Sequence, residues 1–247
     1  MAILKEHIFF YREIFKLPSV ISEPFLMIGY QEIYGSNLPE DFNYKDVKQL
    51  LISKGIKNIT AIDKFDNRAN LKYDLNLPIP KDEYEKYNTI FDIGSLEHIF
   101  DTRQCLENCM RMVKPNGFYF LHTPVNGYFN HGLHTFSPEL IIQSFKLNKF
   151  EIQYERYSSY DGIPLKHPDD VINSLIWIIG KKKESMKIFR IPQQERWCQT
   201  YQPKITQRVK VQHKMGNKIK YLIYQICPPI IFSKLKKVRK IFKSSYK

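Results

Sequence analysis

The sequence lacks several features that would assign a function at once. No apolar run approaches the ~20 residues that a membrane-spanning helix needs, and charged residues interrupt residues 1–15, which excludes a clean signal-peptide core. The chain has no G-K-[ST] phosphate loop and no G-x-S-x-G nucleophile elbow. Kinase-type and serine-hydrolase functions therefore have no residues to support them.

Cysteine is also scarce, with four residues in 247 and no C-x-x-C pair. Cys105 and Cys109 stand four apart in a helix-like segment, and Cys198 and Cys227 are isolated. This usage is typical of buried or idle thiols in a reducing compartment, so we expect a cytoplasmic protein. The length and the 43% hydrophobic content suit one medium domain with appendages.

Acidic residues are missing from the last fifth of the chain. All 25 Asp and Glu lie in residues 1–200, where they balance the 38 − 13 = 25 Lys and Arg found there, whereas residues 201–247 hold the other 13. The whole +13 net charge therefore belongs to residues 201–247, the basic tail. We expect a domain over residues 1–200, with its core at 24–180, followed by this tail.

The basic tail contains an amphipathic pattern in residues 228–243. Ile231, Leu235, Val238 and Phe242 recur at helical spacing among lysines and arginines. Such a helix suits an anionic membrane surface, so we expect peripheral association with the inner face of a membrane. Two alternatives are a basic helix packed on the body and, less favoured because base-stacking aromatics are not concentrated there, binding to nucleic acid.

Strands alternate with helices along the body. Apolar runs predict strands at 24–29, 59–62, 71–73, 88–94, 118–121, 150–154 and 175–179, and periodic patterns predict helices at 3–15 (covering one edge), 47–52, 102–113 and from Ser137 onward. Asp101 and Gln104 have the spacing of a capping box. Residues 114–117 (KPNG) predict a turn, and residues 181–183 (KKK) predict that the chain leaves the sheet at the surface. The order predicts an α/β fold: a doubly wound, mostly parallel sheet with helices on both faces.

Three segments in the middle of the chain resemble a known family. FDIGSLEHIFD, then MVKPNGFYFLHTPVN and GLHTFSPEL, are similar in order and spacing to the S-adenosylmethionine-dependent methyltransferases of the Rossmann-like kind, particularly the bacterial type 11 group. The resemblance covers residues 24–180. It implies a methyltransferase that uses S-adenosylmethionine, with a sugar, glycan-biosynthetic or other small-molecule acceptor.

The resemblance also implies a cofactor site at the carboxyl ends of the strands, where an open α/β sheet binds ligands. Asp63 would receive the ribose hydroxyls, since a carboxylate accepts two hydrogen bonds at once, and Asp74 the adenine amino group. The alternatives without a role in cofactor binding are that Asp63 caps a loop, that Asp74 forms a turn, and that residues 95–97 only turn the chain into the next helix. The implied cofactor-binding residues are Gly29, Asp63, Asp74, Leu75, Ser95, Leu96 and Glu97.

The loop after the first strand departs from the family pattern. Where a G-x-G-x-G loop is usual, residues 29–35 read GYQEIYG, so only Gly29 matches and bulky Tyr30 and Gln31 stand at small-residue positions. An extended loop is expected at residues 36–42. The rival hypothesis is a degenerate, non-catalytic domain that serves as a membrane-associated interaction protein.

Histidines supply the candidate catalytic bases, because an imidazole titrates near neutral pH. The candidates are His98, His131 and His134, although His134 could instead hydrogen-bond the next helix start. The H-x-x-H spacing of His131 and His134, with His122 or His98, makes a metal site conceivable. No second ligand pair of recognised spacing appears, so the sequence predicts no metal.

Overall fold

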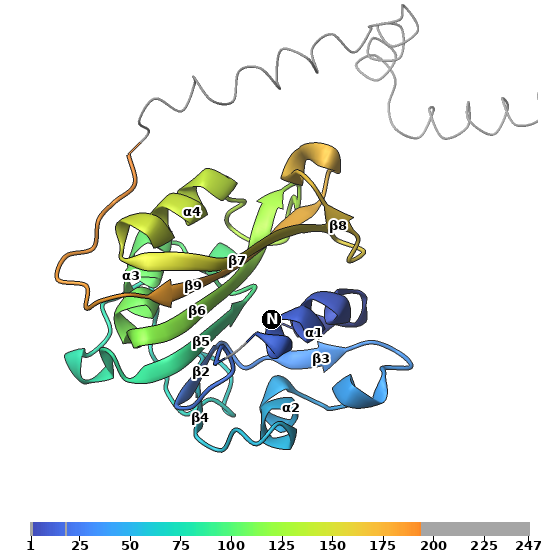
Figure 1. The fold of residues 1–247 in the computed structure, drawn as a ribbon, viewed down its shortest axis with the longest axis horizontal. Coiled ribbons are helices and arrows are strands. Elements are labelled where there is room, and N and C mark those ends of the chain that lie inside the picture. Colours follow the sequence, from blue (N-terminus) through green and yellow to red (C-terminus); the bar gives the residue numbers. More distant parts are fainter. Residues whose placement is uncertain (1, 18, 194–247) are drawn as a thin grey trace, which may run out of the picture. The chain divides into compact units, whose positions relative to one another are not determined.

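The computed structural model describes residues 2–17 and 19–193, and a seven-stranded sheet lies at its centre (Figure 1). The strand order is β4-β2-β5-β6-β9-β7-β8. Pairing is parallel from β4 to β6 and antiparallel from β6 to β8, so β4, β2, β5, β6 and β7 run in one direction. The strands are β2 (Phe25–Ile28), β4 (Ile59–Ile62), β5 (Tyr87–Ile93), β6 (Val113–Asn126), β7 (Phe150–Ser159), β8 (Pro164–Leu165) and β9 (Ser174–Lys182).

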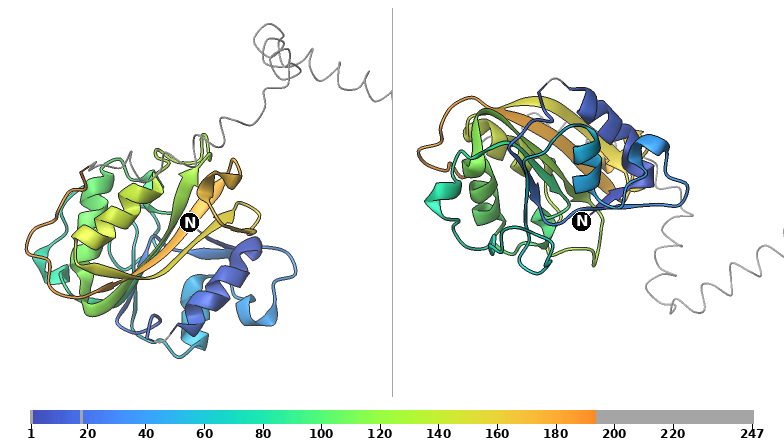
Figure 2. Two further views of the ribbon diagram at one scale, coloured as in Figure 1. Left: turned by 45° about the horizontal axis from the view of Figure 1, so that its top comes forward. Right: turned by 90° about the horizontal axis from the view of Figure 1, so that it is seen from below.

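Helices cover both faces of this sheet, as the sequence predicted. On one face lie α3 (Thr102–Met112) and α4 (Pro138–Leu147), and on the other α1 (Ile8–Lys16) and α2 (Val47–Ser53) (Figures 1 and 2). Strand side chains alternate between the two cores: Leu26 and Ile28 join the α3 and α4 side, whereas Phe25 and Met27 join the α1 and α2 side. Because both faces are buried, such a strand reads as a continuous apolar run.

The N-terminal segment differs from the prediction of one helix over residues 3–15. β1 (Ala2–Leu4) pairs in parallel with β3 (Glu32–Tyr34), and the 3-10 turn η1 (Lys5–His7) leads into α1. Residues 2–4 are extended because β3 offers backbone partners that a local helix pattern cannot reveal. α1 lies on one face of the sheet, with Phe10 stacked on Trp177 at 4.7 Å between ring centroids.

Three other predictions need correction. Leu71 forms only an isolated bridge with Ile62, so residues 71–73 are not a strand. Gln104 donates its backbone N–H to Asp101 at 2.9 Å, but its side chain bonds Asn108, leaving the capping box half formed. Lys182, predicted at a surface exit, is fully buried and pairs with Glu85 at 3.2 Å. The remaining short helices are η2 (Glu40–Phe42), η3 (Lys81–Glu83), η4 (Leu96–His98) and η5 (Pro168–Asp170).

The basic tail lies outside the described residues, as do Cys198 and Cys227. The amphipathic stretch at residues 228–243 therefore stays a prediction. Cys105 and Cys109 are buried free thiols, as expected. Among residues 2–17 and 19–193, no helix has the length and apolar character needed to cross a membrane.

Candidate functional site

The carboxyl ends of β2, β4, β5 and β6 meet along one edge of the sheet. The chain proceeds from β2 to β4 on one side and then to β5 on the other, so strand order reverses between β2 and β5. In open α/β sheets ligands bind at such a switch point. The loops after these strands therefore form the candidate site.

The loop after β2 places a buried amide side chain at the switch point. Gly29 adopts φ 77°, a conformation that favours glycine, and donates its N–H to Ile62 O at 2.6 Å. The fully buried Gln31 places its Nε2 3.2 Å from Ile28 O and 3.0 Å from Phe91 O, across the ends of β2 and β5. Its Oε1 is buried without a hydrogen-bond partner among the described residues. The space between the two strand ends is thus filled by a side chain of the protein.

Tyr30 ties the same loop to the end of β4. Its N–H donates to Asp63 Oδ2 at 3.1 Å, and its hydroxyl donates to Asp46 at 3.2 Å. The guanidinium of Arg68 lies 4.2 Å from the Tyr30 ring centroid and pairs with Glu32 at 2.8 Å. These contacts fix residues 29–32 over the strand ends.

Asp63 and Asp74 both take local hydrogen bonds. Asp63 Oδ1 accepts the N–H groups of Phe65 and Asp66 at 2.9 and 3.0 Å. Burial opposes ionisation of Asp63, but its backbone hydrogen bonds together outweigh burial and lower its pKa. Hydrogen bonds from Lys64, at 2.6 Å, and Asn76 lower the pKa of Asp74 to about 2. Both carboxylates are ionised acceptors at neutral pH. Both also accept N–H groups of their own loops, as the alternatives without a cofactor role expect.

The segment after β5 lies beneath the surface. Ser95 donates its Oγ–H to Ile28 O at 2.7 Å, which joins this segment to the β2 loop, and Leu96 is fully buried. Glu97 is 1% exposed, and Thr123 Oγ1 donates to its Oε2 at 3.0 Å. Desolvation, reinforced by the nearby Asp92 carboxylate, raises the pKa of Glu97 to about 7. Leu75, the implied neighbour of adenine, is buried in the core at 6% exposure.

The loop after β6 brings one predicted histidine to Glu97. His131 Nε2 lies 3.9 Å from Glu97 Oε1, and its ring centroid is 5.2 Å from that of His98. Burial and the neighbouring His131 lower the pKa of His98. His134 turns away, with Nε2 3.2 Å from the carbonyl oxygen of Phe100. His122 is buried and stacks on Trp177 with 3.8 Å between centroids.

Sequence reasoning missed the roles of Gln31 and Thr123. Gln31 stood out only as too bulky, and nothing in the local pattern showed that its amide would bridge two strands. Thr123 occupies an apolar strand, where a hydroxyl reads as an ordinary buried polar group. A polar residue inside an otherwise apolar strand end was the available signal.

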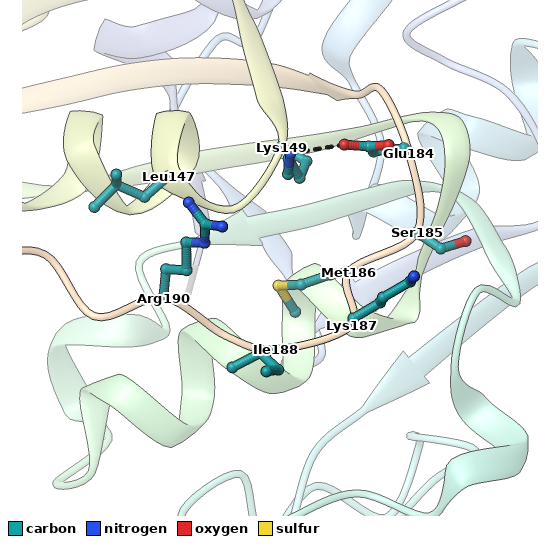
Figure 3. Close-up of a pocket in the computed structure, with 8 residues that line it drawn as sticks. All are labelled: Leu147, Lys149, Glu184, Ser185, Met186, Lys187, Ile188 and Arg190. Atoms are coloured by element: carbon teal, nitrogen blue, oxygen red, sulfur yellow. Dashed lines mark ion pairs between the residues drawn. The ribbon is translucent and has the colours of Figure 1, made fainter.

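A separate hollow lies on the opposite edge of the sheet, near the start of β7 and the segment after β9 (Figure 3). Lys149 and Glu184 form an ion pair there at 2.7 Å. None of the residues predicted for cofactor binding or catalysis lines it. Its lining residues are Leu147, Lys149, Glu184, Ser185, Met186, Lys187, Ile188 and Arg190.

The site fits the hydrogen-bonding groups of S-adenosylmethionine in part. The hydroxyls, ammonium group and adenine amino group of that cofactor are donors, and the acceptors along one edge are Asp63, Asp74 and the Oε1 of Gln31, which has no partner among the described residues. The inner end of the site is filled by the Gln31 amide. A cofactor reaching the switch point must contact this side chain or displace it.

No known family model matches the chain, and no curated protein matches it. Solved structures similar to it include the Burkholderia thailandensis 1,6-didemethyltoxoflavin-N1-methyltransferase, at 10% identity over 65% of this chain and 71% of that one, with a TM-score of 0.42. A SAM-dependent methyltransferase of Thermotoga maritima matches at 13% identity over 72% and 97% of the two chains, with a TM-score of 0.43. One from Methanosarcina mazei matches at 15% over 65% and 92%, with a TM-score of 0.42. These values describe a distant likeness.

Proposed function

We propose that this protein transfers a methyl group from S-adenosylmethionine to a small-molecule acceptor. One observation carries the proposal: hydrogen bonds join the loops after β2, β4 and β5 at a single switch point. Gly29 and Tyr30 reach Ile62 and Asp63 on one side, and Ser95 reaches Ile28 on the other. This is the place where an open α/β sheet takes a nucleotide-like ligand.

Each loop has a role in the proposal. Asp63 accepts the ribose hydroxyls, Asp74 and Leu75 lie toward the adenine, and residues 95–97 lie along the methionine part. The cofactor supplies an electrophilic methyl group when it is bound. The protein then has to align the acceptor with that group, and a hydroxyl acceptor also needs a base.

His131 is the best placed of the three candidate bases. Its side chain is 51% exposed and lies beside the buried Glu97, so it can meet an acceptor arriving from solvent. His98 lies next to it, whereas the ring of His134 contacts the Phe100 carbonyl. We therefore assign proton transfer to His131, with His98 as its neighbour.

We further propose a sugar or glycan-biosynthetic intermediate as the acceptor, and an anionic membrane surface as the site of work. The support is the resemblance of residues 24–180 and the charge of the basic tail. Sedimentation with anionic liposomes tests the second part. A protein lacking residues 201–247 should stay in solution, and its continued pelleting would contradict tail-driven association.

A non-catalytic interaction domain is the second candidate function, favoured by the Gln31 amide at the switch point. Calorimetric titration with S-adenosylmethionine separates the two functions. Asp63→Ala should weaken binding about 100-fold, since two hydrogen bonds to a charged acceptor contribute about 3 kcal/mol. Asp41→Ala is the matched control, because Asp41 is exposed and pairs only with Arg12 at the surface in the described contacts. No heat at millimolar ligand would exclude the enzyme.

A further inference from the structure

We propose that Glu97, His98 and His131 bind a divalent transition-metal ion of the zinc class. One ligand atom from each residue lies within 4.8 Å of the other two. A tetrahedral ion about 2.1 Å from each ligand needs these atoms roughly 3.4 Å apart. Glu97 Oε1 and His131 Nε2 are already 3.9 Å apart, and the half-exposed histidine ring can turn to close the remainder.

The backbone holds the two halves of this cluster together. Leu133 and His134 donate their N–H groups to the carbonyl oxygen of Glu97, at 2.8 and 3.1 Å. Gly132 permits this approach, since a Cβ there would lie 2.8 Å from the same oxygen. The loop carrying His131 is therefore clamped onto the residue that supplies the carboxylate, and the three ligands share one short stretch of structure.

Thr123 orients the carboxylate. Its hydroxyl donates to Glu97 Oε2, which leaves Oε1 directed toward His131. Hydrogen bonds of this kind fix the orientation of metal ligands in proteins. Beside His131, at 5.5 Å between centroids, the hydroxyl of Tyr128 is buried without a partner among the described residues, so it can serve a water bound to the ion.

The ligand set selects the class of ion. Two imidazoles and one carboxylate suit Zn²⁺ and its neighbours in the transition series, whereas Mg²⁺ and Ca²⁺ prefer oxygen ligands alone. Three protein ligands leave a coordination position open, as in catalytic rather than structural zinc sites. The pairing of His131 with His98 also differs from the H-x-x-H pairing with His134 that the sequence suggests. The ion would occupy the nitrogen of His131 that the proposed function assigns to proton transfer, so ligand and base are alternative roles of this residue, and metal binding is tested independently of methyl transfer.

Titration of the full chain with ZnCl2, after chelator treatment and desalting, tests the assignment. One ion should bind at this site, and His98→Ala and His131→Ala should each weaken its binding at least about tenfold. Both side chains are exposed, so the variants should keep their melting temperature in the absence of metal. His134→Ala is the matched control and should change affinity less than about twofold.

The visible absorption of bound Co²⁺ supplies a second readout. Wild-type protein should show the bands of a cobalt ion with mixed nitrogen and oxygen ligands, and Glu97→Gln should lose them. Binding that is unchanged in both histidine variants overturns the proposal, as does a loss in His134→Ala equal to that in His98→Ala. Absence of any bound ion in the wild type also overturns it.

Discussion

Replacing Gln31 by alanine should make the protein bind S-adenosylmethionine more tightly while making it less stable. The side chain is fully buried at the switch point, where its amide nitrogen donates to Ile28 O and Phe91 O. We predict that the cofactor of the proposed function displaces this side chain and enters its space. The variant removes the occupant in advance.

The magnitude follows from the two hydrogen bonds. Each neutral bond contributes about 1 kcal/mol, so displacing the amide costs the cofactor about 2 kcal/mol. Relief of that cost should lower the dissociation constant about 30-fold. The free energy of unfolding should fall by about 2 kcal/mol, because the loss of both bonds and of one buried methylene exceeds the relief of an Oε1 that has no partner among the described residues.

Calorimetric titration with S-adenosylmethionine measures the first effect and urea denaturation the second. Gln49→Ala is the matched control, since this glutamine is exposed on α2 and distant in sequence from the strand ends. A wild-type protein that binds the cofactor and a Gln31→Ala variant that binds it no more tightly would refute the displacement. Weaker binding by the variant would show that the amide contacts the ligand instead.

Two further predictions concern stability. Lys182→Met should lower the free energy of unfolding by about 3 kcal/mol in urea denaturation, because the carbonyl oxygens of Met110 and Val113 lose a buried charged donor at 3.0 and 2.6 Å. Lys183→Met, at an exposed position, is the control. An equal fall in unfolding free energy in the two variants would contradict the role of the Lys182 hydrogen bonds. Burial raises the pKa of Asp92 to about 6, so the stability that protonated Asp92 provides is complete below about pH 4 and lost as pH rises through about 6. Asp92→Asn should flatten the fall of up to about 3 kcal/mol in unfolding free energy between about pH 4 and 7, and an unchanged pH profile would show that Asp92 is not its source.

Local sequence signals predicted much of the fold because the central strands are buried on both faces. Residues 59–62 form a strand as the apolar run indicated, and Asp101 caps α3 through the N–H of Gln104. Local signals gave wrong predictions where contacts with a distant segment determine the conformation or burial of a residue. The extension of residues 2–4 depends on β3, and the burial of Lys182 depends on the carbonyls at the end of α3.

The sequence indicated where along the chain the candidate site residues lie better than it indicated which of them lie side by side. Asp63 lies at the carboxyl edge because the parallel strand β4 places it there, and Asp74 lies near it through the bridge of Leu71 to Ile62 and the bond from Lys64. Spacing along the chain, however, paired His131 with His134, while the structure places His131 beside His98 and Glu97, more than thirty positions earlier. Such a pairing follows from how one loop folds over another and leaves no periodic trace.

The two-stranded sheet of β1 and β3 attaches the N-terminal segment to the loop after β2. Residues 2–4 pair with residues 32–34, directly after Gln31, and Lys5 Nζ donates to Ser36 O at 2.7 Å. Release of this pairing would remove one restraint on the loop without breaking a bond of the seven-stranded sheet. The shape of the switch point is therefore set partly from outside the main sheet, and residues 2–5 take part in shaping the proposed cofactor site although none of them is among the residues assigned to it.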